Sequence, residues 1–204
     1  MSLESIARKI EEHKLTNELI ERTNRKERLI LTGASRIAKS LITTSLAKKE
    51  SKKLLVIVPT LEDATRWLPL VQDCGWTKTC LYPSTEVSPY DSIQITSEIL
   101  WGQLQVLSDL LDLKNDESIA IIATERSLQP HLPPPEYLKS RCIKLKIGDE
   151  INITKMSVKL SESGYIKTNN IDQEGTWSRR GDILDIYPVS SELPIRLELF
   201  GDRI

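Results

Sequence analysis

Leu29-Ile-Leu-Thr-Gly33-Ala-Ser-Arg-Ile-Ala38-Lys39-Ser40 is the stretch that decides how the first half of this chain is expected to fold. Its apolar start, residues 29–32, runs into a turn and then into a helical pattern. The turn matches the phosphate-binding loop G-x-x-x-x-G-K-[ST] at Gly33, Lys39 and Ser40, in a strand–loop–helix setting. We therefore predict an α/β domain in which residues 29–32 form a strand and a helix begins near Ile37.

The same loop departs from that motif at Ala38, where the motif requires glycine. Glycine allows backbone N–H groups to wrap phosphates, and a Cβ obstructs that close approach. The apolar run at 118–123 is followed by Thr124 and Glu125, without the aspartate that helps to hold Mg²⁺ in such sites. We predict a degenerate phosphate loop without ATP hydrolysis. A nucleotide hydrolase, with Lys39 on the phosphates and Ser40 on Mg²⁺, is the alternative.

Two further apolar runs, 54–58 and 119–123, lack polar alternation, as is typical of strands buried on both faces of a parallel sheet. Helical patterns separate the runs, one beginning at Thr60 and one over about 97–111. Strands and helices that alternate in this way predict an α/β layer with a parallel sheet, helicase-like in its order. We assign it to residues 1–127.

A change of character follows at residues 130–135, where four prolines in six positions cannot continue a helix or a central strand. Beyond them the apolar residues at 143–147 alternate with lysines, which predicts a strand. A helix over about 153–163 and strands near 165–171, 181–187 and 195–199 complete the pattern. We predict a small α+β domain with a mainly antiparallel sheet over residues 128–204.

The composition excludes several classes of protein. Lys plus Arg number 28 and Asp plus Glu 29, so no global positive charge would draw this chain to nucleic acid. No apolar run approaches the roughly 18 residues that a membrane helix needs, and the N-terminus lacks a secretory signal. Three cysteines and two histidines without metal-ligand spacing predict neither a metal site nor a disulfide framework. We expect a cytoplasmic protein.

Three stretches together resemble a known family: the loop at 33–40 followed by Leu55-Val-Ile-Val-Pro59, the stretch Tyr82-Pro83 to Pro89-Tyr90, and Gly175-Thr-Trp-Ser-Arg-Arg180-Gly181-Asp-Ile-Leu184-Asp185-Ile-Tyr187-Pro188. The last runs on into Pro194-Ile-Arg196-Leu-Glu198-Leu-Phe200-Gly201-Asp202 and is the most specific. From about residue 27 onward the chain resembles the N-terminal UvrB-homology module of the bacterial transcription-repair coupling factors. UvrB-like DNA-damage-binding subunits share the last motif, but they have an intact phosphate loop and a tyrosine-rich hairpin. In the matching region this chain has only two tyrosines, Tyr82 and Tyr90.

The resemblance implies a non-catalytic adaptor that recruits the nucleotide-excision-repair protein UvrA to stalled transcription complexes. Residues 1–127 would be a scaffold like domain 1a of UvrB, and residues 128–204 a UvrA-binding domain like domain 2, truncated at its C-terminus. The arginine that contacts UvrA in the family maps onto Arg180, and we expect further contacts from Arg179, Trp177, Tyr187 and Lys167. Arginine and aromatic side chains are enriched among interface hot spots.

The resemblance also implies what the longer protein would contain. It would be an ATP-dependent DNA translocase that binds RNA polymerase and duplex DNA, with ATP and Mg²⁺ in motor domains outside this chain. For residues 1–204 themselves we expect no cofactor and no contact with a membrane. A UvrB-like subunit that binds damaged DNA is the other alternative, and the balanced charge of both halves disfavours it.

Overall fold

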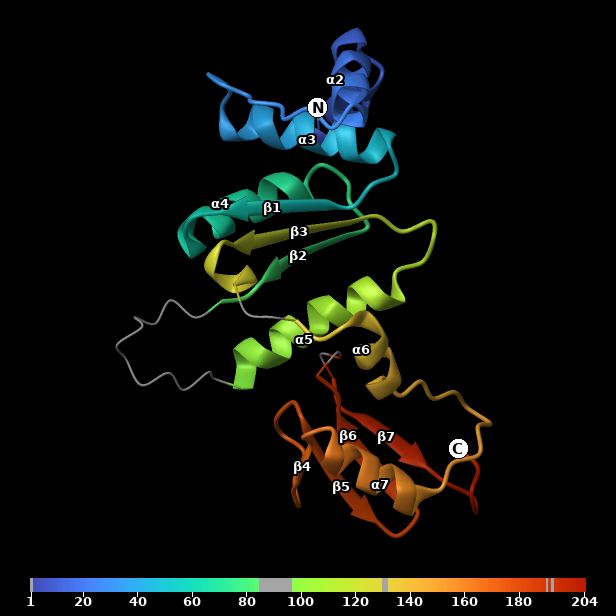
Figure 1. Cartoon of the computed structure of the whole chain (residues 1–204). Helices are drawn as coiled ribbons and strands as arrows, with labels where there is room; N and C mark the ends of the chain where they lie inside the picture. The colour runs from blue at the N-terminus through green and yellow to red at the C-terminus, as the bar shows by residue number, and fades with distance from the viewer. Residues whose placement is uncertain (1, 85–96, 130–131, 190, 192) are drawn as a thin grey trace, which may run out of the picture. The chain divides into compact units, whose positions relative to one another are not determined.

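The computed structural model describes residues 2–84, 97–129, 132–189, 191 and 193–204, and these fall into two compact units (Figure 1). The first unit comprises Met1–Gln94 and Asp112–His131, and the second comprises Ile95–Leu111 and Leu132–Ile204. The second unit therefore includes a helix near residue 100 that we had grouped with residues 1–127. The division into family domains at 127/128 stays a prediction. In the described residues, no helix is long and apolar enough to cross a membrane.

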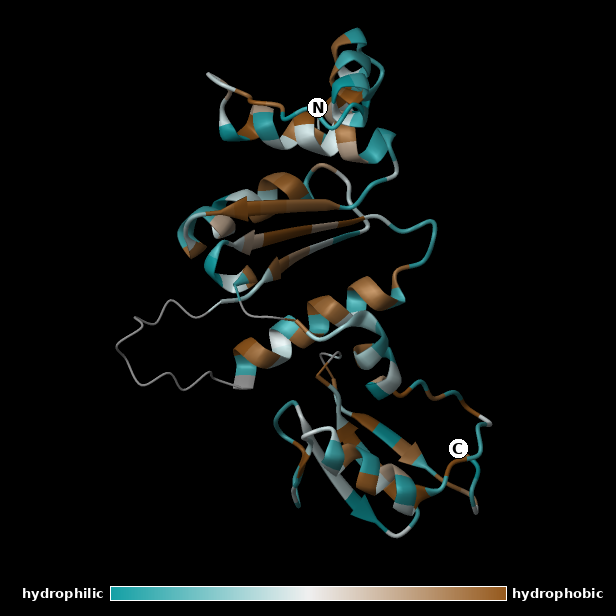
Figure 2. Cartoon of the chain, viewed as in Figure 1, coloured by the Kyte–Doolittle hydropathy of each residue, from teal (hydrophilic) through white to brown (hydrophobic). Residues whose placement is uncertain are grey.

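The first unit is built on a parallel sheet of three strands, β1 (Leu54–Val58), β2 (Lys78–Tyr82) and β3 (Ile119–Thr124). The strands lie in the order β1-β3-β2, so the last strand in sequence occupies the centre. The predicted strands at 54–58 and 119–123 are confirmed, and so is the parallel sheet. Figure 2 shows β1 and β3 as strongly hydrophobic along most of their length, which is the pattern that identified them.

Four helices complete this unit: α1 (Leu3–Glu11), α2 (Lys14–Asn24), α3 (Arg36–Lys49) and α4 (Leu61–Gln72), with a short 3₁₀ turn η1 (Arg126–Leu128) after β3. The hydroxyl of Thr60 accepts a hydrogen bond from the amide of Asp63, which caps α4 where the sequence predicts its start. The core between helices and sheet contains Ala7, Leu41, Ala64, Val71, Cys74, Trp76 and Ile122.

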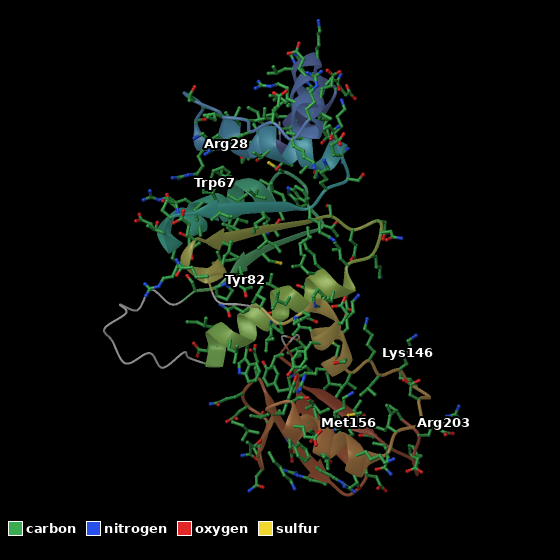
Figure 3. The ribbon with its side chains drawn as sticks, in the orientation of Figure 1. Arg28, Trp67, Tyr82, Lys146, Met156 and Arg203 are labelled. Carbon is green, nitrogen blue, oxygen red and sulfur yellow. The ribbon has the colours of Figure 1, made fainter. Side chains whose placement is uncertain are left out.

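The prediction of a strand at 29–32 is wrong. This segment, which follows Arg28 (Figure 3), has no regular secondary structure, and Ile30 is 73% exposed. An apolar run becomes a strand only when a neighbouring strand accepts its backbone hydrogen bonds. Among the described residues, the sheet pairs β1 on one side alone, with β3, so residues 29–32 are not part of it.

The second unit contains the antiparallel sheet. Its elements are α5 (Ser97–Asp112), α6 (Pro135–Arg141), α7 (Ile153–Glu162), β4 (Ile166–Lys167), β5 (Thr176–Arg180), β6 (Ile183–Tyr187) and β7 (Ile195–Glu198). The sheet order is β4-β5-β6-β7, and only β4 pairs in parallel. The predicted α+β class is confirmed.

Helix α7 covers one face of this sheet, and Met156 of α7 packs against the core (Figure 3). The buried members of that core are Leu160, Trp177, Leu184, Ile186, Leu197 and Leu199. The strand predicted at 143–147 is absent, because these residues have no regular secondary structure. Ile143 and Leu145 nevertheless pack against the core while Lys144 and Lys146 are exposed, as the alternation indicated. Ile147, which the same alternation placed on the buried face, is 96% exposed, so that part of the prediction is wrong.

Candidate partner-binding groove

The hairpin between β5 and β6 determines where Arg180 lies. Arg180 pairs with Ile183, so the loop between the two strands consists of Gly181 and Asp182 alone. Gly181 has φ +62°, a left-handed conformation that two-residue hairpin loops require at the first loop position and that glycine adopts without strain. The R-G pair in the sequence therefore places an arginine as the last residue of β5, directly before the turn.

Successive residues of β5 point to opposite faces of the sheet. Trp177 lies in the core with α7, and Arg179 is on the same side, where its Nη1 donates to Thr154 Oγ1 of α7 at 3.3 Å. Ser178 and Arg180 face the opposite side. The five predicted contact residues are therefore divided between two faces.

On the face opposite α7 the structure has a groove of about 520 Å³ that contains Arg180. Ser178 of β5, Asp185 of β6 and Arg196 of β7 are paired across the three strands in one row along it. Its lining residues are Asn169, Asn170, Ile171, Ser178, Arg180, Asp185, Pro194, Ile195 and Arg196. The groove thus combines the segment that follows β4 with residues of β5, β6 and β7.

Arg180 is exposed, and its guanidinium is held at one side of the groove. Its Nη2 donates a hydrogen bond to the backbone carbonyl of Asn169 at 3.1 Å. A carbonyl carries no formal charge, so this bond orients the guanidinium without neutralising it. An arginine has five N–H donors in a planar fork that matches a carboxylate, so the side chain can also bind an incoming acidic group.

Asp185 and Arg196 form a two-point ion pair in the same groove. Arg196 Nε donates to Oδ1 of Asp185 at 2.7 Å and Nη2 donates to Oδ2 at 3.0 Å. The hydrogen bonds from Arg196 hold the pKa of the Asp185 carboxyl below its usual range, and the charges of Arg196 and Arg180 add to that effect. Neither residue of this pair was among the contact residues predicted from the sequence. The signal was available, because opposite charges at facing positions of adjacent strands attract.

The other predicted contact residues lie outside the groove lining. Tyr187 is half-buried near the opposite end of β6 and pairs with Thr176. Trp177 is 4% exposed, so it is a core residue of this unit, and its indole N–H has no hydrogen-bond partner among the residues that the structure describes. Lys167 is exposed, with Nζ 5.4 Å from the centre of the Trp177 ring. Arg180 alone of the five predicted residues lines the groove.

Side chains of the loop at 33–40 form hydrogen bonds with the loop's own backbone groups. Gly33 has φ +71°, and Ser35 caps α3, its hydroxyl accepting a hydrogen bond from the amide of Ala38 at 3.3 Å. Ser40 is fully buried, and its hydroxyl donates to the carbonyl of Ile37 at 2.8 Å. Lys39 is half-buried in the first turn of the helix.

Tyr82, at the end of β2 (Figure 3), is 4% exposed, while Tyr90 lies outside the described residues. Among the described residues, no group of three or more His, Cys, Asp or Glu side chains is placed to hold a metal ion.

Comparison with known proteins identifies relatives of the chain. Residues 143–204, which include the groove, match a sequence model of the UvrB interaction domain. The chain is 30% identical over 175 residues to the transcription-repair-coupling factor of Haemophilus influenzae and 32% identical over 183 residues to that of Bacillus subtilis. The Escherichia coli protein of the same name is 25% identical over 174 residues.

These alignments cover 85–86% of this chain but only 15% of each relative, so the chain spans about one seventh of the length of the proteins it matches. The match at 143–204 coincides with most of the second unit. The resemblance drawn from the motifs is thereby confirmed: the chain is similar over most of its length to part of the bacterial transcription-repair-coupling factors, and its residues 143–204 match the UvrB interaction domain.

Proposed function

We propose that this chain is the adaptor module of a transcription-repair coupling factor, which binds UvrA through the groove at Arg180 and has no chemistry of its own. In the longer protein it would bring UvrA to stalled transcription complexes, with RNA polymerase and duplex DNA bound by other parts. ATP and Mg²⁺ would belong to those parts as well. Localisation in the cytoplasm is part of the same proposal.

One observation carries the proposal. The residues that match the UvrB interaction domain form a groove with an exposed and oriented guanidinium, Arg180, on the face of the sheet opposite α7, and among the described residues no carboxylate pairs with it. Arginine in a partly enclosed site is a common hot spot of protein interfaces, because it pairs with a carboxylate through two hydrogen bonds. The groove therefore has the chemistry to recognise an acidic side chain on a protein partner.

A nucleotide hydrolase is supported less well. In such an enzyme a serine at the position of Ser40 binds Mg²⁺, but here its hydroxyl is buried and donates to Ile37. The Ser35 hydroxyl occupies the amide of Ala38, one of the donors that would otherwise bind phosphate. Arg36 pairs with Asp63 at 3.1 Å. We propose that residues 33–40 are a degenerate phosphate loop whose remaining role is to begin α3.

Direct binding to damaged DNA, as in UvrB, is also supported less well. Residues 128–204 contain eleven basic and eleven acidic side chains, so this half carries no net charge to attract a phosphate backbone. An affinity for duplex DNA that falls steeply with salt would favour this alternative over the adaptor.

Calorimetric titration of the chain into UvrA tests the proposal. We expect saturable binding, and we expect Arg180→Ala to weaken it about thirtyfold, the effect of losing a hot-spot arginine worth about 2 kcal/mol. Arg179→Ala is the matched control, because its side chain lies on the α7 side, and it should stay within about threefold of the parent. Absence of binding by the parent chain would contradict the adaptor function. ATP turnover that Lys39→Ala abolishes would establish the hydrolase instead.

A further inference from the structure

Among the described residues that line it, the groove contains two guanidinium groups and one carboxylate, and the carboxylate is bound by only one of the two. Arg196 donates to both oxygens of Asp185, at 2.7 and 3.0 Å, whereas Arg180 donates to the neutral carbonyl of Asn169. The charge of Arg196 is therefore balanced by a carboxylate within the groove, whereas among the described residues no carboxylate balances the charge of Arg180. The groove thus holds one ion pair, between Asp185 and Arg196, and one arginine, Arg180, that can bind an incoming carboxylate.

Arg180 is close enough to Asp185 to compete with Arg196 for its carboxylate. Arg180 pairs with Ile183, so Asp185, two residues further along β6, is its diagonal neighbour on the same face of the sheet. Diagonal neighbours are within reach of a side chain as long as arginine. The positive charge of Arg180 also acts on Asp185, since it is one of the causes that lower the pKa of that carboxyl, after the hydrogen bonds and the charge of Arg196.

Asp185 thus has two candidate cations, and its partner decides which arginine stays available. Only 19% of the Asp185 side chain is exposed, against 59% of the Arg196 side chain that pairs with it from β7. The guanidinium of Arg180 donates instead to the carbonyl of Asn169, in the segment after β4. A carboxylate that loses its bound cation in a partly desolvated site attracts the nearest alternative cation.

We propose that Arg196 is a positioning residue which, by holding Asp185, keeps Arg180 available to a carboxylate on the partner protein. This inference rests on the proposed function, in which that partner is UvrA. The groove is then a site for one carboxylate, although it contains two arginines. Arg196 contributes to binding through Asp185 and need not touch the partner.

This role of Arg196 makes the effects of substituting Arg196 and Asp185 on affinity for UvrA non-additive. In Arg196→Ala, Asp185 loses both hydrogen bonds, captures Arg180 and occupies the donors that the partner requires, so affinity for UvrA falls about tenfold. In Asp185→Asn no carboxylate remains to capture Arg180, so affinity stays within about threefold of the parent. In the double variant Arg180 is available again, and we expect recovery to within about threefold of the parent.

Calorimetry of the four proteins against UvrA therefore tests the inference as a double-mutant cycle. Recovery of affinity in the double variant supports it. If Arg196 contacted the partner directly, removing Asp185 could not restore the affinity lost with Arg196. A double variant as weak as Arg196→Ala, or an Arg196→Ala variant as tight as the parent, overturns it. Both results leave the proposed function intact, which fails only if the parent chain does not bind UvrA.

A second measurement needs no partner. The Nε–Hε resonance of Arg180 in a ¹⁵N NMR spectrum reports what the guanidinium contacts. We expect this resonance to shift in Arg196→Ala and to return to its parental position in the double variant, while thermal unfolding confirms that all four proteins are folded. Arg179→Ala, on the other face of the sheet, should leave the resonance unchanged. An Arg180 resonance that does not move in Arg196→Ala overturns the inference.

Discussion

Trp101 of α5 packs against Tyr165 of the second unit, with ring centroids 6.3 Å apart and ring planes inclined at 43°. The same indole covers Gly175, the residue before β5: a Cβ built on Gly175 would lie 2.5 Å from Trp101 Cζ2. Gly175 also has φ +74°. The glycine that opens the most specific sequence motif is therefore needed both for its backbone conformation and for the close approach of an aromatic ring.

Gly175→Ala should destabilise the second unit by about 2–4 kcal/mol, because a left-handed backbone and a steric clash with Trp101 act together. Gly164→Ala is the matched control, since Gly164 has φ +88° but nothing within 4 Å of a Cβ, and it should cost only about 1 kcal/mol. Urea denaturation of both variants measures the difference. Equal costs would show that contact with Trp101 contributes nothing to stability.

The Asp185–Arg196 pair should make stability depend on pH. The pKa of Asp185 is lowered in the folded protein by hydrogen bonds from Arg196, so its contribution to stability is present above the unfolded-state pKa, near 4, and is lost as pH falls through the lower folded value. Comparison of the parent with Asp185→Asn by urea denaturation checks this. The parent should be the more stable at pH 7, and the difference should shrink at about pH 3 and below. A difference that is the same at both pH values would contradict the ion-pair explanation.

Thr44 should matter more than its neighbour Thr43. The indole N–H of Trp76 donates to Thr44 Oγ1 at 3.2 Å inside the core of the first unit, and Thr44 is fully buried. Thr44→Val leaves that N–H without its acceptor and should cost about 1–3 kcal/mol. The hydroxyl of Thr43 bonds to the carbonyl of Lys39 in its own helix, so Thr43→Val should cost under about 1 kcal/mol. Thermal unfolding of both variants is the measurement, and a reversed order would contradict the assignment.

Ala38→Gly restores the glycine of the phosphate-loop motif but should not restore nucleotide binding. Ser35 still caps α3, Ser40 still donates to Ile37, and Arg36 still pairs with Asp63. Glycine in the first turn should instead destabilise α3 by up to about 1 kcal/mol. Titration with Mg-ATP checks the first expectation and thermal unfolding the second. Submillimolar Mg-ATP binding by the variant would show that Ala38 alone had inactivated the loop.

The elements that the sequence predicted correctly are those with a strong local signal. The apolar runs at 54–58 and 119–123 are strands, and α4 begins directly after Thr60, as the helical pattern indicated. Gly181 is left-handed in the hairpin that presents Arg180. Each of these features depends on residues close together in the chain, so composition and spacing were enough to find them.

The failures arose where a partner distant in sequence decides the outcome. Residues 29–32 have the apolar character of a strand, but no neighbouring strand pairs with them in the described sheet. The sequence could not show which predicted contact residues share a face: the alternation of β5 directs Trp177 into the core with α7 and places Arg180 on the other face, while contact of either with UvrA stays a prediction. The Asp185–Arg196 pair joins two strands whose register the sequence did not fix.

The sequence by itself determined the two fold classes, the family resemblance and the candidate Arg180, because hydrophobic period, turn glycines and motif order are properties of neighbouring residues. Only the tertiary structure decided which candidates share a site. Strand pairing places Ser178, Asp185 and Arg196 in one row, and the segment after β4 brings Asn169 to Arg180. The groove consists of residues from β5, β6 and β7 and from the segment after β4, and their side chains come together only when backbone hydrogen bonds fix the register of the sheet.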